Sequence, residues 1–434
     1  MTDISTILLC FSGLLTASTQ RHLLLTIEAL LSMSGRITLL GISRWTEAGG
    51  SYRTLQRFAA NVLDWQALNW ALFKHFILDS EDVILIAGDT TTVTKAGKCT
   101  YGLGRYFSSI YNRAVPGVSF LCLSLVSVKR RCAFPIVVEQ FVKSITAKTV
   151  DTTQTKRKAG RPKGSRNKNQ NKQLSESTRW IQEHLKALLE RMKNQLKPIY
   201  FLYDNALGNL EGIVMCESLA LHLISKLKCN SALWFPYEGE YSGRGAPRIY
   251  GNKLNYKSLP ANHLKHSETR EDILTHIYQL TVRHKRFPKP ITVVIIQKTH
   301  LETQKMSQII LFSTDLELPW DKLMEYYQLR FQIEFNFRDA KQYWGLEDFM
   351  NVGQKQVHNM ANLSLFMVNM SHALLQQEAY QGMSVLQLKA WFQAGKFVKE
   401  TLKQLPQSLE PNLISQITQR ACRFSREKTQ ALAT

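Results

Sequence analysis

Acidic residues are scarce in this chain relative to basic ones. The 434 residues include 55 Lys and Arg but only 34 Asp and Glu, which gives a formal net charge of +21 at pH 7. The isoelectric point is near 9.6. A basic excess of this size predicts a polyanionic partner, with nucleic acid as the first expectation and an acidic membrane surface as the second.

Cysteine is also sparse and shows no pattern. The seven cysteines are odd in number, scattered, and never spaced as C-x2-C. This distribution argues against a disulfide framework and against a zinc cage, and it predicts reduced thiols in a cytosolic protein. His263 and His266 have H-x2-H spacing, but without a nearby Cys or a second pair we expect no metal site there.

Long hydrophobic runs are missing as well. No stretch approaches the roughly 20 apolar residues that a membrane span requires. The first residues do not resemble a signal peptide, because Asp3 stands where Lys or Arg is usual and the first apolar run breaks at Ser12 and Gly13. With 44% hydrophobic residues, the chain has the composition of a folded globular protein, and its length predicts two to four domains.

The pattern of apolar and polar residues changes several times along the chain. Helical spacing gives way to short β-branched runs, then to a polar basic stretch, and later to a Gly-punctuated region with strand-like runs. Within the second region, strands are predicted at 117–128 and 134–141, and apolar spacing predicts helices near 178–196 and 208–226. We therefore predict a helical, DNA-binding region at 1–80, the first part of an α/β core at 81–235 with a flexible basic insert at 143–179, a β-rich insertion at 236–316, a helix completing the core at 317–350, and a helical C-terminal region at 351–434.

Residues 38–57 have the pattern of a helix-turn-helix. Thr38 opens a first helical segment, Gly49 and Gly50 make a turn, and Ser51 caps a second helix that carries Arg53 and Arg57. This order of elements is typical of a DNA-binding domain, although any small helical bundle can show it. We predict that Arg53 and Arg57 contact DNA.

The basic insert cannot build a core. Residues 143–179 hold 11 Lys and Arg against two acids. At its centre, Gly160-Arg161-Pro162 is flanked by bases that include Lys163 and Arg166, and it resembles an AT-hook, which lies in the narrow minor groove of A·T-rich DNA. The alternative is a solvated basic linker, but nonspecific DNA affinity follows from the charge in either case.

Two predicted strands are each followed by an aspartate. The β-branched run at 83–87 leads to Asp89, and the apolar run at 198–203 leads to Asp204. A carboxylate at such a position is often only a turn or a cap. Two of them, however, could meet at one edge of a sheet.

The residues Tyr327, Arg330, Glu334 and Lys341 form the spacing Y-x2-R-x3-E-x6-K. On one continuous helix they would share an arc of roughly 60°, because each residue turns about 100°. A lone acid between cations suits a phosphodiester, since the acid can hold a metal ion and the cations can hold phosphates. The rest of this segment is apolar and aromatic, which predicts a buried helix rather than a solvated charged face.

Asp89, Asp204 and Glu334 are distant in sequence but could converge. Three carboxylates without His or Cys favour hard divalent cations such as Mg²⁺ or Mn²⁺. Two such ions can activate an attacking hydroxyl and stabilise the leaving oxygen of a phosphodiester. We therefore predict a two-metal site for nucleic-acid cleavage.

The four-residue helix signature, with Asp89 in GDTTTVTKAG and Asp204 in YDNALGN, resembles the DDE transposases of bacterial insertion sequences, in particular the family typed on insertion sequence four. The resemblance covers roughly residues 81–350. It implies an α/β fold with a ribonuclease-H-like catalytic core, interrupted before its Glu helix by a β-rich insertion.

The resemblance also implies a cut-and-paste reaction, in which water would cleave DNA at the terminal inverted repeats of the element and the freed 3′-OH would later attack the target DNA. Asp89, Asp204 and Glu334 would hold two metal ions, and Tyr327, Arg330 and Lys341 would bind phosphates near the cut end. The partners would be double-stranded DNA at terminal inverted repeats and at the target, bound by a homodimer in the bacterial cytoplasm and associated with the nucleoid. Family members stack a tryptophan of the inserted region on a displaced base, and Trp234 and Trp320 are candidates for this, as they are for core packing.

Two other readings stay open at the level of sequence. One is a transposase-derived regulatory protein that binds DNA without cutting it. The other is a metal-dependent nuclease, which shares the core chemistry but has no need for the four-residue signature.

Overall fold

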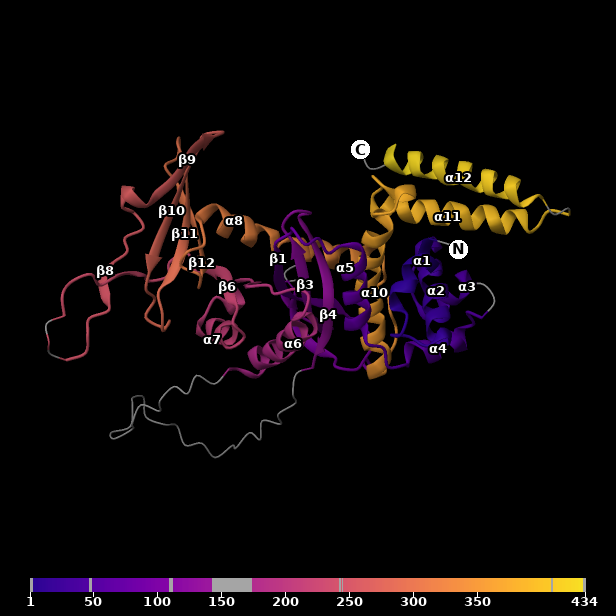
Figure 1. Ribbon diagram of the computed structural model, residues 1–434, viewed down its shortest axis with the longest axis horizontal. Helices are drawn as coiled ribbons and strands as arrows, with labels where there is room; N and C mark the ends of the chain where they lie inside the picture. Colours follow the sequence, from indigo (N-terminus) through magenta and orange to yellow (C-terminus); the bar gives the residue numbers. More distant parts are fainter. Residues whose placement is uncertain are drawn as a thin grey trace, which may run out of the picture. The chain divides into compact units, whose positions relative to one another are not determined.

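A computed structural model describes residues 3–46, 49–108, 112–142, 174–241, 243, 245–406 and 409–431. The chain divides into two compact units (Figure 1). Unit 1 contains Met1–Phe141 and Phe331–Thr434, and unit 2 contains Val142–Arg330.

Unit 1 begins with short helices, as the sequence predicts. Thr16, Thr38, Ser51 and Asp64 each accept a hydrogen bond from the backbone N–H three residues later, which satisfies a donor that the first turn leaves unpaired. The helices are α1 (Asp3–Leu8), η1 (Leu9–Phe11), α2 (Ala17–Ser32), α3 (Leu39–Trp45), α4 (Tyr52–Ala59) and α5 (Trp65–Phe76).

The strands of unit 1 are organised around one long strand. β3 (Arg113–Ser127) pairs antiparallel with β1 (Ile84–Thr94), β2 (Gly104–Ser108) and β4 (Cys132–Phe141). The strand predicted at 83–87 runs further than expected and ends at Thr94, because the β-branched residues after Asp89 continue the pairing with β3. Asp89 therefore lies within β1 rather than at its end.

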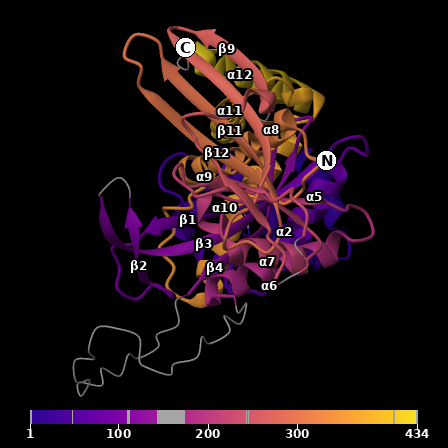
Figure 2. The same ribbon diagram turned by 90° about the vertical axis from the view of Figure 1, so that its left-hand side faces the viewer.

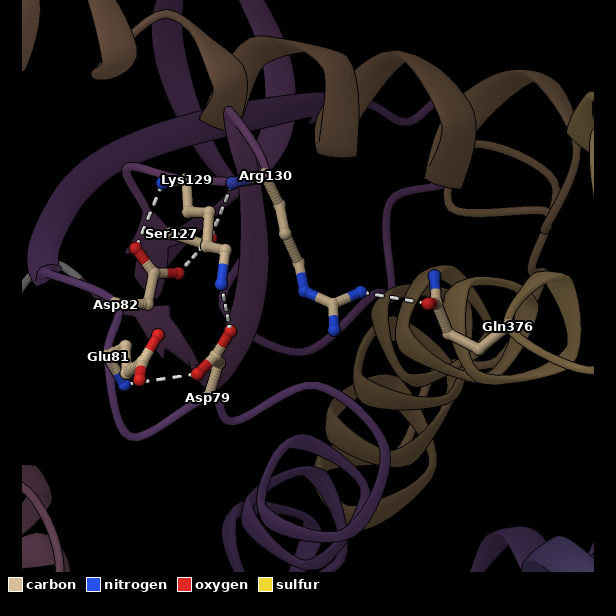
Figure 3. Close-up of polar contacts among 7 residues, drawn as sticks. All are labelled: Asp79, Glu81, Asp82, Ser127, Lys129, Arg130 and Gln376. Atoms are coloured by element: carbon tan, nitrogen blue, oxygen red, sulfur yellow. Dashed lines mark hydrogen bonds and ion pairs between the residues drawn. The ribbon is translucent and has the colours of Figure 1, made fainter.

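A polar network fixes the start of β1 to the turn between β3 and β4 (Figure 3). The Ser127 hydroxyl donates to Asp82, and the Lys129 backbone N–H donates to the other oxygen of Asp82 at 2.9 Å. The Lys129 ammonium reaches Asp79 at 2.6 Å, and this bond lowers the pKa of Asp79. Arg130 Nη1 donates to Gln376 at 2.9 Å, which ties the same turn to the end of a C-terminal helix.

The core of unit 1 joins this sheet to helices from both ends of the chain. α5 and α10 pack on β4 (Figure 1), and α9 packs on β4 and β1. The β3–β4 pairing is irregular near Pro135, and there the buried Asn369 Nδ2 donates to the carbonyl of Pro135 at 2.5 Å. The side chain thus provides a hydrogen-bond partner for a backbone carbonyl in the core. The C-terminal elements are α9 (Gln332–Gln342), α10 (Gln354–Leu375), η4 (Glu378–Tyr380), α11 (Val385–Leu402) and α12 (Pro411–Ala431).

Unit 2 contains a mixed sheet. Its strands follow the order β5-β6-β12-β11-β10-β9, in which β5 and β6 are parallel and the later pairs antiparallel. The elements are α6 (Glu176–Met192), β5 (Tyr200–Leu202), η2 (Asn205–Leu207), α7 (Leu210–Ser218), β6 (His222–Leu227), β7 (Trp234–Pro236), β8 (Tyr250–Lys253), η3 (Ala261–His263), β9 (Leu264–Arg270), β10 (Ile273–Val282), β11 (Ile291–His300), β12 (Met306–Ser313) and α8 (Trp320–Leu329).

One helix predicted for unit 2 is wrong. The apolar spacing at 208–226 predicts a single helix, but α7 stops at Ser218 and residues 222–227 form β6. Ala220 has a φ of 55°, a left-handed conformation that ends the helix, and the following residues pair with β5 and β12. Short apolar runs fit either type of element, and here the neighbouring strands decide.

The predicted fold class is confirmed. Sheets flanked by helices give a mixed α/β protein consistent with a ribonuclease-H-like core, and helical segments stand at both ends of the chain. The seven cysteines are all free. Within the described ranges, the helices are all too short or too polar to cross a bilayer.

Candidate active site

Asp89 faces the helical side of the sheet in unit 1. It is half-buried, directly opposite Cys122 on β3, and its Oδ1 accepts the Thr90 N–H at 2.7 Å. Burial raises the pKa of Cys122 to about 12, and the charge of Asp89 adds to this increase. Residues that oppose each other or alternate along a strand share a face, so Asp89 lies on the same face as Cys122 and Val93.

That face is the one covered by the helix of Glu334. Val93 and Cys122 belong to a hydrophobic cluster that also contains Ile333 and Phe337 of α9. Glu334 lies in the first turn of α9, where the positive end of the helix dipole favours a carboxylate. The structure of unit 1 therefore places Asp89 and the Glu334 helix on the same side of the sheet.

Lys341 fastens α9 to β1. Its ammonium donates to the carbonyl of Thr92 at 3.3 Å and forms an ion pair with Glu347 at 3.1 Å. Glu334 and Lys341 are seven residues apart on one helix, which brings them back to within about 20° of the same direction. Two of the four signature residues, Glu334 and Lys341, therefore lie on one face of α9.

The predicted helix is not continuous. α8 ends at Leu329 and α9 begins at Gln332, with a turn at Arg330 and Phe331 between them. The common arc calculated for one helix therefore holds only within each part. In unit 2, Arg330 lies 5.9 Å from the centre of the Tyr327 ring, so these two members of the signature are neighbours.

The helix is also less buried than its composition predicts. Ile333 and Phe337 are buried, but Phe331 and Phe335 are 48% and 37% exposed. Their rings meet edge to face at 5.4 Å. The sequence identified α9 as apolar all round because aromatic residues occupy both of its faces, and the packing shows that only one face enters the core.

Asp204 stands in unit 2, two positions after the end of β5. Its Oδ1 accepts the Ala206 N–H at 2.9 Å and caps the short helix η2. Its backbone carbonyl accepts the Ser225 hydroxyl at 2.7 Å. The half-buried carboxylate thus has a turn-forming role of its own, in addition to any role in catalysis.

The donor set suits a hard cation, since all three predicted ligands are carboxylates. Asp89 and Glu334 belong to unit 1 and Asp204 to unit 2. Over the part of the chain that the structure describes, no group of three or more His, Cys, Asp or Glu side chains is arranged to hold a metal ion. The assembly of the three acids around two ions stays a prediction.

The other predicted DNA contacts differ in what the structure describes. Arg53 and Arg57 are exposed on α4, whose other face buries Leu55 and Phe58. Arg161, Lys163 and Arg166 of the basic insert lie outside the described residues.

The two candidate tryptophans are half-buried. Trp234 has the Lys285 ammonium 4.8 Å from its ring centre, and Trp320 stacks on His266 at 5.9 Å. Both rings are thus engaged within unit 2.

Sequence reasoning missed Lys95, which lies near the end of β1. Its ammonium donates to the carbonyls of Phe349 at 2.7 Å and Glu347 at 3.3 Å, just after α9. Burial lowers its pKa to about 8. The position directly after the threonine-rich run was the available signal, but only the fold shows that Lys95 and Lys341 both join β1 to the segment of α9.

Comparison with known families gives the identification. The family described as DDE superfamily endonuclease matches residues 10–284, which is more than half of the chain. The chain belongs to this family. The match includes Asp89 and Asp204 and ends before Glu334. A search of curated proteins finds no match.

Membership in this family indicates the general type of reaction and substrate. DDE endonucleases act on DNA and use divalent metal ions, so this DDE endonuclease is a nuclease- or transposase-type enzyme with a DNA substrate. The high positive charge agrees with that substrate.

Proposed function

We propose that the protein is a DNA transposase that moves an insertion sequence by a cut-and-paste reaction, of the type represented by insertion sequence four. The observation that carries this proposal is the attachment of α9 to β1, in which Lys341 bonds Thr92 and sets the Glu334 helix over the face of Asp89. Together with the DDE endonuclease family match, this supports a catalytic pair of acids in unit 1.

Each residue of the site has a proposed role. Asp89, Asp204 and Glu334 hold two Mg²⁺ or Mn²⁺ ions, which when bound supply an activated hydroxyl and stabilise the charge on the leaving oxygen. Arg330 and Lys341 hold phosphates near the cut end by charge-assisted hydrogen bonds. Tyr327, which adjoins Arg330, contributes a phenol beside that guanidinium.

The remaining DNA contacts are proposed to position the substrate. Arg53 and Arg57 bind one part of the terminal inverted repeat, and Arg161, Lys163 and Arg166 add affinity through the phosphates. Because two element ends must be processed together, we propose a homodimer acting on double-stranded DNA in the cytoplasm, at the nucleoid.

The test uses purified protein, Mg²⁺ and a labelled duplex that carries one end of the element, read from the flanking inverted repeats. Asp89→Asn and Glu334→Gln should each lower cleavage at least about 100-fold, since even the outer-shell partners of metal ligands cost 10- to 100-fold when removed. Binding of the same duplex should stay close to wild type.

The matched control is Asp339→Asn on the same helix. Asp339 bonds Arg338 and lies about 140° around α9 from Glu334, so this change should leave cleavage intact. Cleavage at the wild-type rate by Glu334→Gln would refute the assignment. Binding without cleavage by the wild-type protein would instead support a transposase-derived regulatory protein.

A further inference from the structure

The β2–β3 hairpin extends beyond the packed part of the sheet in unit 1. β3 pairs with β1 over residues 117–127, where every position is buried, and with β2 over residues 113–117, where most are exposed. The ribbon formed by β2 and the start of β3 is visible at the left of Figure 2.

The base of this ribbon is fixed. The Tyr106 hydroxyl donates to the carbonyl of Phe141 at 3.2 Å, and burial raises the pKa of Tyr106, which keeps the phenol protonated as a donor. Gln140 donates to the carbonyl of Tyr101 at 2.7 Å, and the Tyr101 N–H donates to Val352 at 2.9 Å. These bonds hold the ribbon to β4 and to the segment before α10, so its outer face is presented on a rigid support.

The outer face of the ribbon carries a large exposed aromatic ring. Phe107 is 68% exposed, and strand alternation puts Arg105 on the same face, with Ala114 and Pro116 opposite them on β3. These three neighbours are exposed as well. Arg105 Nη2 donates to the carbonyl of Ala114 at 2.9 Å, which holds the guanidinium across the ribbon beside Phe107.

The charge around the ribbon points to a polyanion. The ribbon strands carry Arg105 and Arg113, and no Asp or Glu occurs in the sequence between Asp89 and Glu139. An exposed phenyl ring costs solvation free energy wherever it meets water. A flat ring beside cations in a segment without acids is the combination that binds nucleic-acid bases by stacking while the cations meet the phosphates.

We propose that the outer face of the β2–β3 ribbon binds unpaired bases of DNA, with Phe107 stacking on a base and Arg105 contacting the adjacent phosphate. The proposal deepens the proposed function, because it assigns to the same DNA substrate a contact outside the three acids. An unpaired base is the occupant, since a base in an intact duplex already stacks on its neighbours on both sides.

The experiment measures binding without divalent ions, so no cleavage occurs. The probes are two labelled duplexes of the same sequence, one fully paired and one with a bulge of unpaired adenines that includes 2-aminopurine. Phe107→Ala should weaken binding of the bulged duplex by about 5- to 150-fold, the equivalent of one lost base–aromatic stack, and should leave the paired duplex within about twofold. The quenching of 2-aminopurine by the wild-type protein should disappear.

Two further variants make the result specific. Phe107→Trp should restore both affinity and quenching, because a larger ring still stacks. Phe424→Ala removes a phenyl ring that is 61% exposed on the basic helix α12, and it should leave both duplexes unaffected.

The proposal fails if Phe107→Ala weakens the paired and bulged duplexes equally, or if its effect matches that of Phe424→Ala. Its failure is distinct from failure of the cleavage assignment, because binding is measured without metal. A protein that does not cut DNA could still show the stacking, and one that cuts DNA could lack it.

Discussion

At the scale of single residues, burial has changed the acid–base chemistry beside α10. His358 Nδ1 lies 3.7 Å from Glu139 Oε2, close enough for an ion pair. Burial nevertheless raises the pKa of Glu139 to about 7 and lowers that of His358. Both changes favour the uncharged forms, so near neutral pH the contact is weak as an ion pair.

This difference predicts a pH-dependent effect of Glu139→Gln. A folded pKa near 7 against 4.5 in the reference state means that folding takes up a proton between these values, so wild-type stability falls as the pH rises through that window. Glutamine does not ionise, so the stability of the variant does not fall with pH in this way. We expect the variant to melt above wild type at pH 8.5, and the difference to shrink as the pH falls to 5.

Thermal melts across this pH range test the prediction, with Glu378→Gln as the control because Glu378 is exposed in the same unit. A control that showed the same pH-dependent gain would assign the effect to net charge rather than to burial of Glu139.

At the scale of elements, Lys389 of α11 joins the ends of two helices. Its ammonium donates to the carbonyl of Leu30 in the last turn of α2 at 2.7 Å, and to that of Tyr343 at the end of α9 at 3.3 Å. It also lies 4.7 Å from the centre of the Trp344 ring, and burial lowers its pKa to about 8. A cation at a helix C-terminus meets carbonyls that have no partner within the helix.

Lys389→Met should therefore destabilise unit 1. The methionine keeps most of the apolar stem but leaves two partly buried carbonyls without this donor, which should lower the free energy of unfolding by about 1–3 kcal/mol. Urea unfolding measures the change. Lys403→Met just past the end of α11, where the ammonium is exposed and pairs with Glu400, should shift it by no more than about 0.5 kcal/mol. Equal shifts in the free energy of unfolding of the two variants would show that the hydrogen bonds of Lys389 to the two helix ends do not stabilise unit 1.

At the scale of the whole molecule, charge is the property that most affects DNA binding. The eight Lys and Arg within residues 156–172 lie outside the described residues, but their charge follows from the sequence. Replacing all eight by Ser should weaken nonspecific DNA binding and reduce the slope of log affinity against log salt by up to about 7, because each neutralised phosphate contributes about 0.9.

A scrambled insert of the same composition is the matched control. It should keep the salt slope, but it should lose any preference for A·T-rich DNA that depends on Gly160-Arg161-Pro162. An unchanged slope in the Ser variant would make the segment a linker, and an unchanged A·T preference in the scrambled protein would remove the AT-hook interpretation.

Much of the fold could be predicted, because helix caps and β-branched runs are local signals. Ser51 caps α4 as expected, and Thr38, where the predicted first helical segment opens, is the N-cap of α3. The strands predicted at 117–128 and 134–141 appear as β3 and β4 with small changes of boundary. The errors fell where tertiary contacts decide. The threonines after Asp89 extend β1 because β3 is beside them, and residues 222–227 become a strand because β5 and β12 pair with them.

By itself the sequence determined the chemical groups available to this protein: three widely spaced acids, a basic excess and a signature in which Glu334 and Lys341 are two helical turns apart. Only the tertiary structure decided that Asp89 lies inside a strand, that the signature helix breaks after Leu329, and that Lys341 bonds a carbonyl 249 positions away. The physical reason is the distance along the sequence over which each interaction acts. Periodicity and capping act over a few residues, whereas the pairing of strands and the packing of helices depend on partners that local patterns do not specify.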